Sequence, residues 1–489
     1  MKISLKNFFA TLLFLCIQGS LLYGQSTKNY SNDVKAKISQ VESNLTGWVQ
    51  IGKKQSKWTL AERMKFYHAN GVSVTVIKDY KIEWTKSYGW ADSAEQRPVT
   101  PTTLFQAGSN SKSLNAIGVL KLVQDGKLNL YSDINNYLKT WKFPYDSLSK
   151  GKKITIANLL SHTAGLTVHG FGGYQQGDKI PSLIQILNGK KPANSEAIRS
   201  MYEPSLKYEY SGGGTTILQL IIEDVTGQAY DKYMQEKVLK PLGMEYSSYT
   251  QPPSKEKQGL LATGYYNDGK PVKGKYHIYP EQAAAGLWTT SNDLAKYVIE
   301  TQLALEGKSQ KVLNKEMTML RLTPYANRSS ALGIFIENKN NVKYFNHGGV
   351  DEGFVSQYVG SFEGGNGVVV MTNTYNTTLY EEIINSIAIT YNWKNYYSPV
   401  IKTEITLSDS LMESFIGKYK LGTDTLSIIR KIDGVYLKVK NDLQLKIHFT
   451  NNTRFFVLEH HDVDFNFETD DKKKIIGFLM NRRRAEKIE

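Results

Sequence analysis

Cysteine is nearly absent from this sequence. The 489 residues contain one, Cys16, and it lies in an apolar stretch near the N-terminus. Disulfide bonds, a cysteine nucleophile and cysteine-ligated zinc are therefore not expected in the rest of the chain. The eight histidines include no His-Glu-x-x-His pair, which leaves a zinc protease unsupported. We expect neither a metal nor a cofactor.

Long hydrophobic runs are also missing. The opening stretch "MKISLKNFFATLLFLCIQGSLLYGQS" has Lys2 and Lys6, then an apolar centre, then Gly24, which is the order of a secretory signal. Its apolar run is short for a membrane span. We expect residues 1–24 to be a signal peptide, with an uncleaved anchor as the alternative. The mature protein is then exported, periplasmic or secreted, and keeps no membrane span.

The charge balance is basic, with a formal net charge of +14. Such a charge favours anionic surroundings, but the lysines are scattered along the chain. The dense basic run "NRRRAEK" from Asn481 is interpreted as a solvated tail. We expect no nucleic-acid partner, and the sequence does not indicate an oligomeric state.

The pattern of elements divides the chain into two parts. Residues 25–398 mix helical and strand periodicities, and "GVSVTVIKDYKIEW" predicts a hairpin that turns near Asp79. Residues 405–489 contain short alternating strands, including two that flank Asp433-Gly434. This second part predicts a small antiparallel barrel or sandwich.

One candidate nucleophile is Ser109 in "FQAGSNSKSLNAIGVLKLVQDGKL", which is followed three residues later by Lys112. The apolar spacing after Ser109 predicts a largely buried helix that ends near Gly126. The ordinary interpretation makes Ser109 the N-cap of this helix. Alternatively, one helical turn places Lys112 over Ser109, where a neutral lysine could accept the serine proton. The same tetrapeptide pattern occurs at Ser147–Lys150 and Ser254–Lys257, so it cannot decide alone.

Two further motifs follow in the chain. "KYEYSGGGTTILQL" places Tyr210 before a glycine run and a helical pattern, and "YFNHGGVDEGFVSQY" carries His347-Gly348-Gly349. Together the three pieces resemble the motifs of the serine β-lactamase and penicillin-binding protein superfamily. Specifically, they are similar to its class C-like branch, where Tyr replaces Ser in the second motif and His can replace Lys in the third. "ITIANLLSHTAGL", "PLGM" and "AAAGLWTTSNDLAKYV" agree, so the resemblance runs from about Gly47 to Trp393.

The resemblance implies a role for each motif residue. Ser109 would be the acylated nucleophile, with Lys112 and Tyr210 as its proton-transfer pair. The backbone N–H groups of Ser109 and Val350 would form the oxyanion hole. His347 would line the pocket wall in place of the usual lysine.

Glycines complete the implied substrate site. Gly348 and Gly349 would let the strand edge approach substrate closely. The second motif usually ends in Asn, but here that position is Gly212, so a side-chain hydrogen bond to the substrate is missing. The bare glycine is expected to open space there.

The fold implied is mixed α/β: a β-lactamase-like antiparallel sheet flanked by helices with an inserted helical subdomain, plus the small C-terminal all-β module, which resembles a lipocalin-like appendage. Two functions remain. The first is a serine hydrolase for a small-molecule or peptide substrate, cell-wall-derived or otherwise, of D,D-peptidase-like or related amide or ester type, with weak β-lactamase activity at most. The second is a non-catalytic penicillin-binding protein or sensor of cell-wall fragments.

Other histidines have simpler interpretations. His162 in "LLSHTAGL" is expected to pack structurally, and His169 in a glycine-rich loop is left open as a pocket border. His460-His461-Asp462 is expected to be solvated rather than to bind a metal.

Overall fold

The computed structural model describes residues 29–53, 55–439, 443–460 and 462–489. The expected signal peptide and Cys16 lie outside these residues. Within them, no helix combines the length and apolar character needed to cross a membrane.

A seven-stranded antiparallel sheet forms the centre of the larger domain, in the order β4-β3-β2-β10-β9-β8-β7. Its hairpin β2–β3 turns at Asp79 and Tyr80, as the alternating valines predict. Strands β9 and β10 are buried along almost their whole length because helices cover both faces of the sheet. The strands are β2 Gly71–Lys78, β3 Lys81–Asp92, β4 Arg97–Pro98, β7 Phe335–Lys339, β8 Val342–Asp351, β9 Phe354–Ser361 and β10 Gly367–Thr372.

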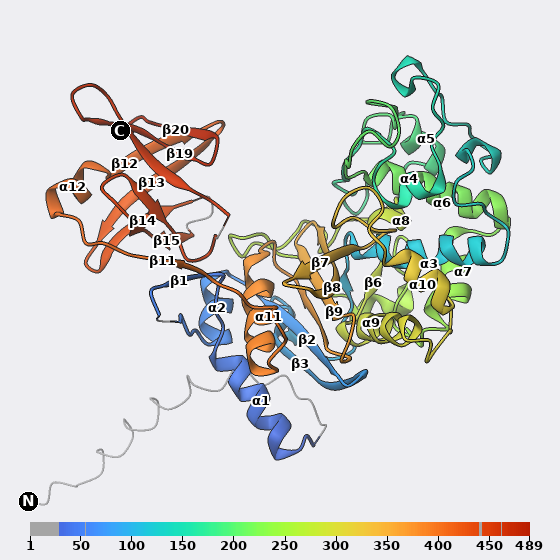
Figure 1. The fold of residues 1–489 in the computed structure, drawn as a ribbon, viewed down its shortest axis with the longest axis horizontal. Coiled ribbons are helices and arrows are strands. Elements are labelled where there is room, and N and C mark those ends of the chain that lie inside the picture. The colour runs from blue at the N-terminus through green and yellow to red at the C-terminus, as the bar shows by residue number, and fades with distance from the viewer. Residues whose placement is uncertain (1–28, 54, 440–442, 461) are drawn as a thin grey trace, which may run out of the picture.

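The two faces of the sheet pack against different helices (Figure 1). Val72, Val74 and Val76 of β2 pack in one apolar cluster with α1 and α11. Ser73 and Thr75 point the other way, toward Ser291 at the start of α9. This alternation follows the two-residue period of a strand. The helices are α1 Asn32–Ser43, α2 Leu60–Phe66, α9 Ser291–Leu305 and α11 Thr378–Thr390.

The chain between β4 and β7, apart from α9, forms the inserted helical subdomain. Its largest helices, α3 Asn110–Gln124 and α6 Gly212–Thr226, are almost entirely buried. Helix α3 ends where Gly126 was expected to stop it, with that glycine at a φ of 70°. The shorter elements are α4 Ile156–Leu160, α5 Leu183–Leu187, α7 Tyr230–Met234, α8 Gln282–Ala285, α10 Lys315–Arg321, β5 Phe105–Gln106 and β6 Trp288–Thr289.

The C-terminal module is a closed antiparallel barrel. Its sheet runs β15-β14-β13-β12-β20-β19-β18-β17-β16, and the two outermost strands are halves of one chain segment interrupted at Ile447. Phenylalanines fill the interior; Phe415 and Phe467 stack with centroids 4.0 Å apart. The elements are α12 Asp409–Ser414, β12 Gly417–Leu421, β13 Asp424–Lys431, β14 Gly434–Lys438, β15 Gln444–Lys446, β16 His448–Phe449, β17 Arg454–Phe456, β18 Phe465–Thr469, β19 Ile475–Met480 and β20 Arg483–Lys487.

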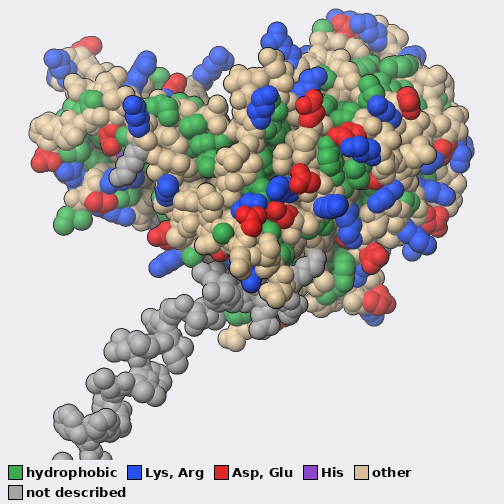
Figure 2. Space-filling model, turned by 60° about the horizontal axis from the view of Figure 1, so that its bottom comes forward, with side chains coloured by type: hydrophobic (Ala, Val, Ile, Leu, Met, Phe, Trp, Pro, Cys, Tyr) green, Lys and Arg blue, Asp and Glu red, His purple; other side chains and the backbone are tan. Residues whose placement is uncertain are grey.

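One expectation about the charges is wrong. The basic run at the C-terminus is not a solvated tail, because it forms β20, which pairs with β19 and β12. Elsewhere Lys and Arg are spread among acidic side chains on the face seen in Figure 2 rather than gathered into one patch.

The barrel docks beside the N-terminal part of the larger domain, at the opposite end of the molecule from the helical subdomain (Figure 1). Strand β1 Val49–Ile51 pairs in parallel with β11 Val400–Lys402 in the connecting segment. Glu459 of the barrel lies 3.3 Å from the buried guanidinium of Arg63. The expected fold class, a mixed α/β domain with a C-terminal β-barrel, is confirmed.

Candidate active site

Ser109 stands immediately before α3 but does not act as its cap. Its backbone is already helical, with φ −65° and ψ −8°, and its hydroxyl makes no capping hydrogen bond. An N-cap normally has extended backbone and a side-chain oxygen that accepts from the helix N-terminus. The geometry therefore rules out the capping interpretation and leaves the hydroxyl available.

Lys112 is the residue that contacts this hydroxyl. Its Nζ lies 3.0 Å from Ser109 Oγ and 2.7 Å from the carbonyl oxygen of Ala284, at the end of α8. The side chain is only 4% exposed, so burial and two hydrogen bonds hold the amine against the serine. This arrangement is the one that nucleophile activation requires.

Tyr210 packs between Lys112 and His162. Its ring centroid lies 5.1 Å from Lys112 Nζ, and its ring packs against His162 at 4.4 Å. The Nδ1 atom of His162 accepts from the backbone N–H of Ser211 at 3.2 Å. Burial, followed by the charge of Lys112, lowers the pKa of His162 well below its usual value. His162 is thus a neutral support for the second motif.

His169 borders the same region from the glycine-rich loop. Its Nδ1 lies 2.6 Å from the carbonyl oxygen of Tyr210, and its side chain is half exposed. His169 therefore lies beside the second motif at the protein surface.

His347 faces the second motif from β8. Its ring lies 6.5 Å from that of Tyr210 and 5.0 Å from that of Phe335. Burial is the largest cause that lowers its pKa to about 3. Nδ1 donates to the Gly348 carbonyl at 2.7 Å, and Nε2 has no partner among the described residues. His347 is thus a neutral imidazole whose Nε2 is a free acceptor among the described residues.

The expected oxyanion hole depends on a close approach between two backbone segments. A Cβ on Gly349 would lie 1.8 Å from the Ala107 carbonyl oxygen, and one on Gly108 would lie 2.4 Å from the Val350 nitrogen. Gly108 also has a φ of 53°, where side chains are disfavoured. The segment before Ser109 therefore lies directly against β8 at Val350, and β7 ends opposite Asn346, short of this position.

Gly348 and Gly212, the other two glycines of the expected substrate site, both lie against neighbouring groups of the protein. The missing side chain of Gly348 faces Gln357 and Tyr380, on the opposite face of the sheet from His347. Gly212 is not beside open space as we expected, because a Cβ there would lie 3.1 Å from Phe171 Cε2 and 3.2 Å from the His169 carbonyl oxygen.

Two buried carboxyl groups near the site escaped the sequence reasoning. Asp351 accepts from the Gly108 N–H at 3.2 Å, and burial raises its pKa well above the usual value. Glu281 precedes α8, is fully buried, and has no partner for either carboxyl oxygen among the described residues. Burial raises the pKa of Glu281 to about 8. The stretch "AAAGLWTT" was part of the family resemblance. It gave no sign that the Ala284 carbonyl would contact Lys112 or that the preceding Glu281 would be buried.

The other Ser-x-x-Lys pairs are not catalytic pairs in this structure. The amine of Lys257 donates to the backbone carbonyls of Tyr246 and Ser247, and Lys150 lies 3.7 Å from Glu203. No group of three or more metal-ligating side chains occurs among the described residues, and His461 lies outside them.

The sheet, the helical subdomain and the Ser109–Lys112 contact are those expected of the serine β-lactamase and penicillin-binding protein superfamily, and comparison identifies the family. The family model described as Beta-lactamase matches residues 59–388, more than half of the chain. The chain therefore belongs to the beta-lactamase family, whose members are generally serine hydrolases.

Individual relatives agree with this assignment. Protein flp of Staphylococcus aureus (strain N315) is 29% identical over 317 residues, which is 63% of this chain and 60% of flp. PbpX of Bacillus subtilis (strain 168), named as a penicillin-binding protein, is 27% identical over 64% of this chain and 73% of its own. The chain thus spans about 60% of the length of flp.

A solved structure shows the same fold. The octameric penicillin-binding protein homologue from Pyrococcus abyssi matches with a TM-score of 0.61 at 22% identity, over 88% of this chain and 98% of that one. Since residues 29–398 make up less than 88% of the chain, the match extends into the barrel.

Proposed function

We propose that the protein is an exported serine hydrolase that forms an acyl-enzyme at Ser109. Its substrate is a small molecule or peptide with an amide or ester bond, of the D-amino-acid-containing type that a D,D-peptidase cleaves. The observation that carries the proposal is the 3.0 Å contact between Lys112 Nζ and Ser109 Oγ. Export rests on the signal pattern of residues 1–24.

The chemistry would proceed in two halves. Ser109 Oγ attacks the substrate carbonyl, and its single proton is taken up by the Lys112–Tyr210 pair. The carbonyl oxygen gains charge and accepts hydrogen bonds from the N–H groups of Ser109 and Val350. The carbon–nitrogen or carbon–oxygen bond then breaks, and the leaving group takes the proton. Water hydrolyses the serine ester in the second half and returns the proton to Ser109.

The neutral state of His347 supports weak β-lactamase activity. A β-lactam carries a carboxylate, and a lysine at this position would offer it a full positive charge. Because the pKa of His347 is lowered to about 3, the imidazole is uncharged at neutral pH. Its free Nε2 is a hydrogen-bond acceptor, which suits a substrate N–H better than a carboxylate.

Intact-mass analysis tests the proposal directly. The full chain is incubated with benzylpenicillin, a D-alanyl-D-alanine peptide and an activated ester, and any adduct is mapped by peptide sequencing. We expect a transient adduct on Ser109, faster turnover of peptide or ester than of penicillin, and neither in Ser109→Ala. Ser147→Ala and Ser254→Ala are the matched controls and should behave as wild type.

Three results would contradict the proposal. An adduct on Ser147 or Ser254 would remove the site assignment, as would undiminished turnover by Ser109→Ala. A penicillin adduct that forms but never turns over, with no peptide or ester hydrolysis, would instead support the penicillin-binding sensor.

A further inference from the structure

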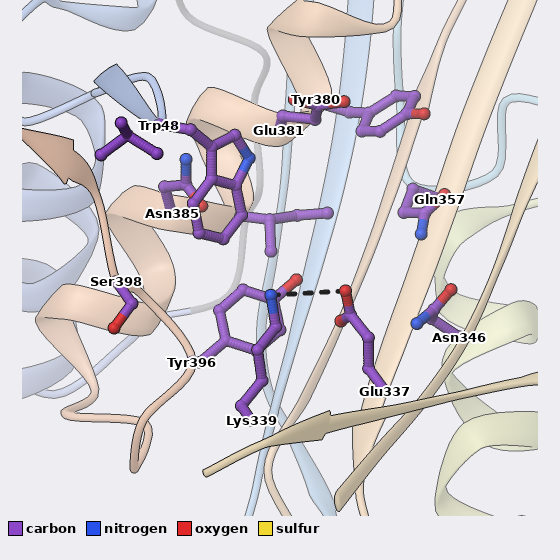
Figure 3. Close-up of a pocket in the computed structure, with 12 residues that line it drawn as sticks. Trp48, Glu337, Lys339, Asn346, Gln357, Tyr380, Glu381, Asn385, Tyr396 and Ser398 are labelled. Carbon is purple, nitrogen blue, oxygen red and sulfur yellow. Dashed lines mark ion pairs between the residues drawn. The ribbon is translucent and has the colours of Figure 1, made fainter. Parts of the chain in front are cut away.

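A cavity lies on the face of the sheet opposite the catalytic site. It has a volume of about 350 Å³ and is lined by Trp48 and by residues of β7, β8, β9, α11 and the segment that follows α11 (Figure 3). Asn346 lines it from β8 and Gln357 from β9, where Gln357 lies directly opposite Gly348 in the sheet. Its size falls within the range of pockets for small molecules.

The cavity contains a buried polar atom without a partner. Asn385 of α11 is fully buried; its Nδ2 donates to the Thr46 carbonyl at 3.1 Å, whereas its Oδ1 has no hydrogen-bond partner among the described residues. A buried polar group left unpaired costs about 1–3 kcal/mol. Asn385 lies in the wall of the cavity, so this wall contains a polar side chain that the described residues do not fully satisfy.

More hydrogen-bonding groups surround Asn385. The amides of Asn346 and Gln357 and the hydroxyl of Tyr380 line the cavity, and Figure 3 shows them along its strand side and top. Amides provide both donors and acceptors, and a hydroxyl does the same. The wall therefore suits a ligand whose own groups donate and accept at once.

The aromatic side chains give the cavity an apolar surface. Trp48 and Tyr396 lie with ring centroids 6.2 Å apart, and Ile384 and Val400 extend this side. Flat ring faces pack well against the C–H groups of another ring. The cavity thus combines an aromatic wall with a polar one.

The charges in the cavity largely cancel. Lys339 Nζ lies 3.3 Å from Glu337 and 4.8 Å from the Trp48 ring centroid. Burial, followed by nearby acidic groups, raises the pKa of Glu381 to about 7. A cavity with one internal ion pair and one partly neutral carboxyl favours an uncharged ligand over an ion.

From these contacts we propose that this cavity is a binding site for a neutral, polyhydroxylated ring, that is, a mono- or disaccharide unit. One ring face packs on Trp48, and the hydroxyl groups bond to the amides of Asn346 and Gln357 and to the hydroxyl of Tyr380. The site is separate from catalysis, because it lies behind β8 while His347 faces the other way.

Calorimetric titration of the full chain tests the site. The probes are glucose, maltose, N-acetylglucosamine and its β-1,4-linked dimer, with tetramethylammonium and acetate as charged comparisons. We expect saturable binding of at least one saccharide, unchanged in Ser109→Ala. Gln357→Ala and Trp48→Ala should each weaken it about tenfold, the upper end for one hydrogen bond. Tyr131→Ala, at a residue 61% exposed elsewhere, is the matched control and should bind as wild type.

A second measurement keeps the test independent of variant folding. Hydrogen exchange of the wild-type chain with the bound saccharide should slow in β8 and α11. The proposal is overturned if no saccharide binds saturably, if only tetramethylammonium or acetate binds, or if protection falls on other elements.

Discussion

The barrel and the helical subdomain bury different kinds of side chain. Among the described residues from 405 onward, the buried polar set contains only His448, whereas the first turn of α3 alone buries Asn110, Ser111, Lys112 and Ser113. The barrel interior is instead filled by stacked phenylalanines such as Phe455 and Phe465, with centroids 4.6 Å apart. This chain can therefore build a core with almost no buried polar side chains. Since buried polar groups cost free energy unless they are paired, the four consecutive ones beside Ser109 indicate chemistry rather than stability.

The largest effect expected from this contrast is at Lys112. Lys112→Met keeps the length of the side chain but removes the amine that lies 3.0 Å from Ser109 Oγ. We expect acylation to slow by about 10²- to 10⁴-fold, as for the loss of a positioned base, with the thermal midpoint little changed. Stopped-flow labelling with an ester probe measures the rate. Lys150→Met, in the exposed Ser-x-x-Lys pair, is the matched control and should acylate at the wild-type rate. An equal loss of acylation rate in this control would contradict the assignment of Lys112.

The barrel should respond in the opposite way. Phe467→Ala deletes a ring that is 2% exposed and stacks on Phe415. We expect the module to lose about 3–5 kcal/mol of stability while Ser109 still labels. Urea denaturation followed by hydrogen exchange of residues 417–487 measures the first, and mass spectrometry the second. Ile432→Ala, at a fully exposed turn residue, should change neither.

Deleting the whole barrel tests whether the larger domain can carry out acylation without it. We propose that residues 25–398 and 405–489 are separate domains, and a chain that ends at Ser398 should still label at Ser109. Some stability should be lost, because Arg63 loses Glu459 and β1 loses β11. Arg63 keeps its bonds to Glu382, which limits the damage. A truncated chain with native circular dichroism that no longer labels would show that the two parts are one unit.

Sequence patterns predicted the parts of the molecule that local periodicity determines. The β2–β3 hairpin and α3 follow from apolar spacing, and the order of three motifs located Ser109 and its neighbours. Strand β20 was missed because its one buried side chain among exposed arginines is the small Ala485, so the alternation is nearly invisible. Its strand character comes from pairing with β12 and β19.

Tertiary approach determines the rest of the site. The Ala284 carbonyl holds Lys112 although 172 residues separate them. Likewise, Gly349 is required by the Ala107 carbonyl that lies against it, not by substrate alone. Neither relation leaves a signal at fixed spacing in the sequence.

A smaller effect concerns Glu281, the buried carboxyl before α8, whose two oxygens have no partner among the residues that the structure describes. Its folded pKa of about 8 exceeds the ordinary 4.5, so between these values the native state binds more protons than the unfolded chain. Stability from this group is present at low pH and is lost as pH rises through 8, at up to about 1.4 kcal/mol per pH unit. Glu281→Gln should flatten the fall in unfolding free energy from pH 6 to 8. Urea titrations at several pH values measure the slope, and a slope equal to wild type would contradict the assignment. Glu256→Gln, at a carboxyl outside the core, is the control.

The smallest expected effect tests the departure from the family's second motif. Gly212→Asn restores the usual side-chain amide, and the φ of Gly212 lies outside the left-handed region, so the backbone permits it. The new Cβ would lie 3.1 Å from Phe171 Cε2, which requires that partly buried ring to move by a few tenths of an ångström. One added hydrogen bond should raise penicillin acylation by up to about tenfold, measured against turnover of the ester probe. Gly170→Asn in the adjacent loop, where a Cβ meets nothing within 4 Å, should leave both rates unchanged. One result would contradict this prediction: Gly212→Asn folds, but its preference between penicillin and the ester probe does not change. In that case the missing amide does not limit β-lactam recognition, and the neutral His347 is the remaining explanation.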